Sequence, residues 1–213
     1  MLTLHGEMTQ ADEPDRQPGE PFMTSLDEIR HHRPCRQGWQ QLTGVIDHDD
    51  RFPASEVLDI CGLDAGLWLL RLWTDETDVM AIYRKLAYWQ LAPVKSLVVE
   101  SGPELELVRK GLSAVGLLAE HPGTSKEYRF ACEWARRNWQ RLGEVAMSAN
   151  LTAPQRFAAE AVQAALHREV HLRPLLVSGP VLEAARQIGL TGMRGVFTER
   201  LRSVFDTGKW PGK

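Results

Sequence analysis

The most regular pattern of apolar and polar residues lies between Val57 and Leu72, on both sides of a glycine. Apolar residues recur there at steps of three and four, the period of a helix that buries one face. Gly62 stands where a helix C-cap glycine is expected, and Asp64 is the expected N-cap of the next helix. The stretch predicts a buried pair of helices. Its expected core residues include Leu67, Trp68 and Leu70.

The same period continues along most of the chain and predicts an all-α fold of about eight helices packed antiparallel. Tyr83, Trp89 and Trp134 are the further expected core residues. Val94–Val99 is the one run that could form a strand, and we interpret it as helix or turn because no neighbouring segment offers a partner. The last expected helices are Lys126–Val145, Leu151–Leu172, Val181–Ile188 and Arg194–Phe205.

Two copies of the pattern Tyr-Arg-x4-Trp, at Tyr83 and Tyr128, are related by a shift of 45 residues. Each follows an apolar helix and a polar break, as in a repeat of two-helix units. Chance similarity between two amphipathic helices is the alternative, because apolar identities are common when helical phases match. Either interpretation predicts stacked antiparallel helices.

Composition divides the chain into three parts. Residues 1–24 are rich in proline and acidic side chains and predict a flexible segment; residues 25–173 predict a helical core domain, and residues 174–213 a C-terminal helical segment. Residues 1–34 carry seven acidic and three basic side chains, whereas residues 170–213 carry seven basic and three acidic. The formal net charge of −3 argues against a protein that coats nucleic acid or an anionic membrane.

The expected location is the cytoplasm. No apolar run approaches the roughly 18 residues of a membrane span, and the first 25 residues lack the apolar core of a secretory signal. Cys35, Cys61 and Cys132 are odd in number, widely spaced and adjacent to apolar residues. We expect the three cysteines to be small buried apolar residues of a protein in a reducing compartment, and we do not expect them to form a disulfide or to bind a metal.

No motif predicts catalysis or a cofactor, since the chain has no P-loop, GxGxxG or GxSxG. The acidic loop at 47–50 is expected to cap the following helix or to be solvated, because its spacing is not that of a calcium loop. His167 and His171 have the i, i+4 spacing of metal ligands. Without a third ligand nearby, we expect a solvated or capping role, no bound metal and no enzymatic activity.

Two segments carry signals of nucleic-acid binding. Arg136 and Arg137 lie among tryptophans that could stack on bases, although the five-residue spacing of the tryptophans places them on different helix faces. Residues 183–191 match the first helix and turn of a helix-turn-helix, whose second helix would carry Arg194, Arg200 and Arg202. Gly192 and Gly195 would lie inside that helix and destabilise it by roughly 1 kcal/mol each. All five arginines are candidate partner contacts.

Residues 26–42 and 57–71 contain Pro34-Cys35-x2-Gly38 and, further on, Gly62-Leu63-Asp64 followed by Leu67-Trp68 and Arg71. This pattern resembles a family of small bacterial and prophage-encoded helical proteins of uncharacterised function, over roughly residues 26–90. Ala65 and Gly66 depart from it, where the family pattern has Asp and Ala. The resemblance implies a mobile-element setting and no particular activity.

The leading interpretation is a non-catalytic cytosolic module that binds a protein. Such a module would be a phage- or prophage-encoded inhibitor, for example an anti-defence protein of anti-CRISPR type, or an adaptor. Its partner would be a host protein or nucleoprotein complex, and no membrane is expected to be involved. The alternative is a DNA-binding transcriptional regulator that uses the C-terminal helix-turn-helix-like segment.

Overall fold

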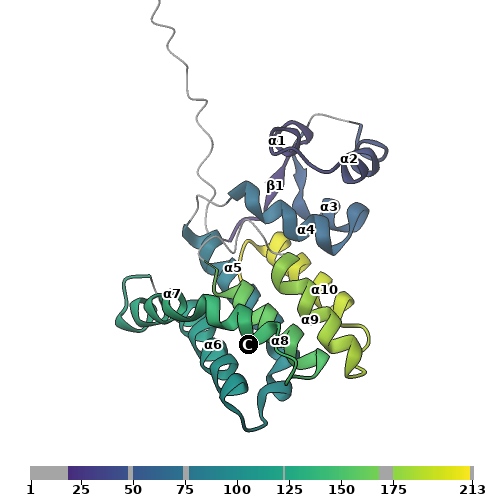
Figure 1. The fold of residues 1–213 in the computed structure, drawn as a ribbon. Coiled ribbons are helices and arrows are strands. Elements are labelled where there is room, and N and C mark those ends of the chain that lie inside the picture. The colour runs from purple at the N-terminus through teal and green to yellow at the C-terminus, as the bar shows by residue number, and fades with distance from the viewer. Residues whose placement is uncertain (1–18, 48–49, 74–76, 122, 168–174, 212–213) are drawn as a thin grey trace, which may run out of the picture.

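The computed structural model describes residues 19–47, 50–73, 77–121, 123–167 and 175–211 (Figure 1). Within them the chain forms ten α-helices, two short 3₁₀ helices and a single pair of two-residue strands. The prediction of an all-α fold is confirmed. None of the described helices combines the length and apolar character that a membrane crossing requires.

The N-terminal elements lie together at one end of the molecule (Figure 1). They are β1 (Met23–Thr24), α1 (Leu26–His31), α2 (Arg36–Thr43), β2 (Phe52–Pro53), α3 (Ala54–Cys61), α4 (Leu63–Leu69) and the 3₁₀ helix η1 (Leu70–Trp73). Ser25 begins α1 with a capping box, in which its Oγ accepts from the Glu28 N–H and Glu28 accepts from the Ser25 N–H. Gly62, at φ +82°, ends α3 and directly precedes α4. Asp64 is therefore in the first turn of α4 and is not its N-cap.

The remaining helices form the larger part of the molecule. They are α5 (Thr77–Gln90), the 3₁₀ helix η2 (Ala92–Val98), α6 (Pro103–Glu120), α7 (Lys126–Ala146), α8 (Ala153–Ala165), α9 (Leu175–Gln187) and α10 (Met193–Thr207). Helices α6, α7 and α8 pack against one another, α8 packs against α9, and α10 packs against α3 and α4. The helical interpretation of Val94–Val99 is confirmed, because most of it lies in η2.

One cluster of buried side chains runs through the described elements. Leu67, Leu70 and Tyr83 belong to it and are at most 3% exposed. Trp68, Trp89 and Trp134 are only partly buried and pack against its edge. The expected core residues thus divide into three in the interior and three indoles at its margin.

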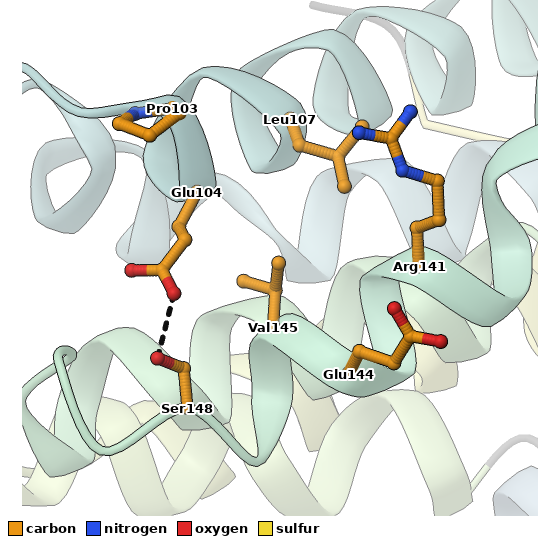
Figure 2. Close-up of a pocket in the computed structure, with 7 residues that line it drawn as sticks. All are labelled: Pro103, Glu104, Leu107, Arg141, Glu144, Val145 and Ser148. Atoms are coloured by element: carbon orange, nitrogen blue, oxygen red, sulfur yellow. Dashed lines mark hydrogen bonds between the residues drawn. The ribbon is translucent and has the colours of Figure 1, made fainter.

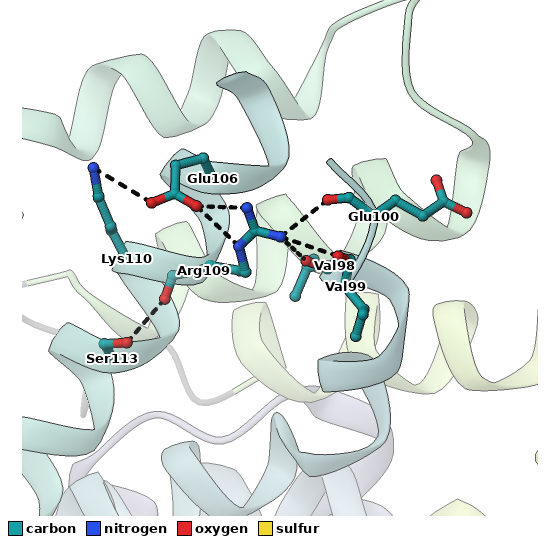
Figure 3. A network of polar contacts seen from close by, with 7 residues as sticks. All are labelled: Val98, Val99, Glu100, Glu106, Arg109, Lys110 and Ser113. Atoms are coloured by element: carbon teal, nitrogen blue, oxygen red, sulfur yellow. Dashed lines mark hydrogen bonds and ion pairs between the residues drawn. The ribbon is translucent and has the colours of Figure 1, made fainter. Parts of the chain in front are cut away.

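Arg109 joins η2 to α6 (Figure 3). Its Nη1 donates to the carbonyls of Val98, Val99 and Glu100 at 3.0–3.1 Å, where η2 ends and lacks helical partners. The same guanidinium binds the carboxylate of Glu106, one turn earlier on α6. That hydrogen bond holds the pKa of Glu106 below its ordinary value, against a smaller opposing effect of burial.

The expected end of the flexible segment at residue 24 is wrong. Phe22 is fully buried, its ring lies 4.7 Å from that of Trp73, and its main chain bonds to Phe205 and Ala54. Met23 and Thr24 then pair with Pro53 and Phe52 in the strand ladder. The composition of residues 1–24 did not predict this order, because a single aromatic residue, Phe22, holds the end of the segment through contacts with Trp73 and Phe205. Residues 1–18 of the expected flexible segment lie outside the described residues.

The parts of the chain on the two sides of the expected boundary at residue 174 pack together, because α9 contacts α8 and α10 contacts α3 and α4. Helix α9 begins at Leu175, so Pro180 lies inside it and does not precede a helix beginning at Val181. Pro180 lacks the N–H that would bond to the Leu176 carbonyl. The expected helix Leu151–Leu172 is described only as α8, and residues 168–174, including His171, lie outside the described part.

The expectation that all three cysteines are buried is also wrong, since Cys35 and Cys132 are exposed and Cys61 is partly buried. Cys35 is the N-cap of α2 and therefore lies outside that helix. Cys132 follows the buried Ala131 on α7 and points away from the buried face. Adjacent apolar residues do not predict burial on a helix, because neighbouring positions point about 100° apart.

Candidate functional site

Helix α7 lies at the margin of the molecule (Figure 1). Ser125 is its N-cap and accepts a hydrogen bond from the Tyr128 N–H at 3.0 Å. Its buried residues are Ala131, Ala135, Leu142 and Val145, which share the face that packs against α6 and α8. The opposite face of this longest described helix is solvent-exposed, so it can contact a partner without rearrangement of the fold.

One edge of α7 carries an aromatic and basic stripe. Phe130, Trp134, Arg137 and Arg141 follow one another at steps of four, three and four residues, which places them on one line along the helix. We call these four residues the α7 stripe. Phe130 is 62% exposed, whereas Trp134 is partly buried and packs against the core. The stripe therefore presents the exposed ring of Phe130 next to Trp134, whose ring is held in place by the core.

The exposed face of α7 has a surplus of positive charge. Its charged residues are Lys126, Glu127, Arg129, Glu133, Arg136, Arg137, Arg141 and Glu144. Glu133 accepts hydrogen bonds from Arg136 at 2.9 Å and from Arg137 at 2.6 Å. These bonds, that of Arg136 first, lower the pKa of Glu133 to about 2. Glu133 is thus ionised at neutral pH and binds both arginines, so the three side chains form a cluster with a net positive charge.

The stripe leads into an open pocket between the start of α6 and the end of α7 (Figure 2). The pocket has a volume of about 380 Å³ and is lined by Pro103, Glu104, Leu107, Arg141, Glu144, Val145 and Ser148. Leu107 and Val145 supply apolar surface, and Arg141 belongs to both the stripe and the pocket. The Ser148 Oγ donates to Glu104 at 2.7 Å and joins the two helices at one end of the pocket. No pattern in the sequence indicates this pocket, because its two sides are about 40 residues apart in the chain.

The C-terminal arginines contact other elements of the same chain. Arg194 lies 3.3 Å from Asp64 of α4, and Arg202 forms a two-bonded pair with Asp59 of α3. This pair lowers the pKa of Asp59, chiefly through the Arg202 hydrogen bond. The Arg200 guanidinium lies over the rings of Trp89 and Trp210, 5.2 and 4.8 Å from their centroids.

The segment expected to resemble a helix-turn-helix does contain two helices, α9 and α10, joined by a short turn. Gly192, expected inside the second helix, is instead the N-cap of α10, at φ +83°. Gly195 does lie inside it. Because Arg194 and Arg202 pair with carboxylates of α4 and α3, part of the surface expected to read DNA packs against the N-terminal helices.

The aromatic residue on the other edge of α7 has a local role. Trp139 donates its Nε1–H to the Gln163 carbonyl at 3.1 Å, and its ring lies 5.6 Å from that of His167. These contacts join α7 to the end of α8. Over the described ranges, no three His, Cys, Asp or Glu side chains gather as a metal-binding group.

Comparison of the chain with models of known protein families, with curated proteins and with solved structures gives no match.

Proposed function

We propose that the protein is a non-catalytic binding module and that the α7 stripe holds an acidic, amphipathic segment of a partner protein. The observation that carries this proposal is the exposure of Phe130 within a basic face of a rigid helix. Aromatic residues and arginines contribute most of the binding energy at protein interfaces. Because α7 is already packed on two neighbouring helices, it can present Phe130 and its arginines to a partner with little loss of conformational entropy on binding.

The chemistry of the stripe favours a protein over a nucleic acid. Carboxylates are interspersed with the arginines, and Glu133 already binds Arg136 and Arg137. A phosphate backbone presents continuous negative charge, which Glu127, Glu133 and Glu144 would repel. A protein segment can instead place isolated carboxylates at Arg137 and Arg141 and apolar side chains on Phe130 and in the pocket, beside Leu107 and Val145.

The expected alternative, a DNA-binding regulator that uses α9 and α10, has less support. Arg194 and Arg202 would have to leave Asp64 and Asp59 before they could contact phosphate or bases, and both carboxylates would then be unpaired near the DNA. The resemblance of residues 26–90 to bacterial and prophage-encoded proteins supports a bacterial partner. An inhibitor or adaptor of phage or prophage origin would act by such a contact.

Site-specific photocrosslinking tests the proposal. Benzoylphenylalanine at position 130 should crosslink one acidic protein in bacterial cells, whereas the same group at Val45, which is 66% exposed on the N-terminal part, should not. With that protein purified, Phe130→Ala should weaken Kd about tenfold or more, as for an interface hot spot. Arg137→Glu should slow association, since opposite charges accelerate encounter. Val45→Ala is the matched control and should leave Kd unchanged.

Equal crosslinking from positions 130 and 45, or an unchanged Kd for Phe130→Ala, would contradict the proposal. A nanomolar, sequence-selective complex with duplex DNA in physiological salt would replace it by the DNA-binding alternative, because non-specific contacts give a Kd of only about 10⁻⁴–10⁻⁶ M. Phe130 is exposed, so its removal should leave the melting temperature unchanged, and a loss of binding would not reflect unfolding.

A further inference from the structure

Two cysteines far apart in the sequence contact the same residue. The Gly38 N–H donates to Cys35 Sγ at 3.3 Å, and Cys61 Sγ donates to the Gly38 carbonyl at 3.6 Å. Cys35 is the N-cap of α2, and Cys61 is the last residue of α3. Both sulfurs therefore lie beside one residue, although 26 positions separate them in the chain.

The two thiols differ in their surroundings. Cys35 is exposed and is the N-cap of a helix of eight residues; the exposed Arg36 follows it directly, and the exposed Arg33 lies two positions before it. Cys61 is partly buried, and burial raises its pKa; the neighbouring Cys35 adds to this, because two thiolates would repel each other. Reactive cysteines are found in exposed, electropositive surroundings at helix N-termini. Because of this contrast, we expect Cys35 to react first with a reagent in solution and Cys61 to react second.

Gly38 leaves room for the Cys35 sulfur. A Cβ at this position would lie 3.3 Å from Cys35 Sγ, closer than ordinary van der Waals contact. A side chain here would therefore crowd the sulfur on the side of Gly38. A disulfide needs a sulfur–sulfur separation of roughly 2.0 Å, so its formation requires both cysteine side chains to rotate toward each other beside Gly38.

We propose that Cys35 and Cys61 form a thiol–disulfide exchange site that takes a low-molecular-weight disulfide such as glutathione disulfide. The Cys35 thiolate attacks one sulfur of that disulfide, forms a mixed disulfide and releases one glutathione thiolate, which takes up a proton. The Cys61 thiol then loses its proton and attacks Cys35 Sγ, which forms the Cys35–Cys61 bond and releases the second glutathione. Two protein thiols are oxidised and one glutathione disulfide is reduced to two thiols. This proposal does not depend on the α7 stripe.

Mass spectrometry of the reduced full-length protein after incubation with glutathione disulfide tests the proposal. Remaining thiols are blocked with iodoacetamide. The wild-type protein should lose two hydrogens and retain one blocked thiol, at Cys132, and peptide mapping should join Cys35 to Cys61. Cys61→Ser should stop at a stable mixed disulfide on Cys35. The Cys35→Ser variant should react with glutathione disulfide at least tenfold more slowly than the wild-type protein, because the remaining thiol of the pair, Cys61, is less accessible.

Cys132 supplies the internal control. It is exposed on α7, which packs against α6 and α8, whereas Cys35 and Cys61 belong to the α2 and α3 pair. Cys132→Ser should form the same bridge at an unchanged rate. A bridge that includes Cys132, a wild-type product that stops at the mixed disulfide, or faster reaction at Cys132 than at Cys35 would each overturn the proposal. Circular dichroism of each variant separates these outcomes from misfolding.

Discussion

Truncation of Phe22 to alanine tests how the N-terminal segment joins the fold. The side chain is fully buried, and its ring lies 4.7 Å from that of Trp73 and 5.9 Å from that of Phe205. Its N–H donates to the Phe205 carbonyl, and its carbonyl accepts from the Ala54 N–H, each at 2.8 Å. Phe22→Ala leaves those main-chain bonds available and removes the ring between η1 and α10.

The expected loss follows from burial and cavity formation. Truncation of a buried phenylalanine to alanine lowers the free energy of unfolding by about 3–5 kcal/mol, and domains of this kind have about 5–15 kcal/mol in total. Each kcal/mol lowers Tm by about 2–4 °C at this chain length, so Tm should fall by about 6–20 °C. Phe22→Leu keeps an apolar side chain but loses two ring contacts, each worth roughly 0.5–1.5 kcal/mol, and should have a smaller effect.

Urea unfolding followed by tryptophan fluorescence measures both variants, and equal m-values would show that the same surface is exposed on unfolding. Near-ultraviolet circular dichroism should also change in Phe22→Ala, because Trp73 loses its edge-on neighbour. A loss below about 0.5 kcal/mol, which is the usual range of a surface substitution, would place Phe22 outside the core and refute the reasoning.

Two further predictions concern polar contacts between elements. A double-mutant cycle of Asp59→Asn and Arg202→Ala should give a coupling of about 0.2–1 kcal/mol at neutral pH, because the pair is partly exposed. The pKa of Asp59 is lowered from 3.8, so the coupling should be lost as pH falls below that value, and a coupling that persists in acid would contradict the ion pair. Arg109→Ala should lower the free energy of unfolding by about 1–2 kcal/mol, because it removes charged donors from three carbonyls. Chemical denaturation measures this loss, and Lys110→Ala, at a more exposed neighbour, should change stability by less than about 0.5 kcal/mol.

The sequence by itself determined the features that depend on near neighbours in the chain. The helical period predicted the all-α fold because burial of one face repeats every three to four residues. Ser25 and Glu28 have the spacing of an N-terminal capping box, because the two residues lie three apart and their hydrogen bonds close within one turn. Gly62 was recognisable as a helix end because glycine adopts its positive φ without steric cost.

Tertiary structure alone decided which side chains meet across long separations. The sequence placed Arg194 and Arg202 together on a basic helix, but only the packing of α10 on α3 and α4 supplies Asp59 and Asp64 as their partners. The exposure of Phe130 likewise depends on which face of α7 its two neighbours cover. An apolar residue at a given helical phase is equally suited to a core or to an interface. The pattern within one helix cannot distinguish them, because the neighbours that exclude water come from distant parts of the chain.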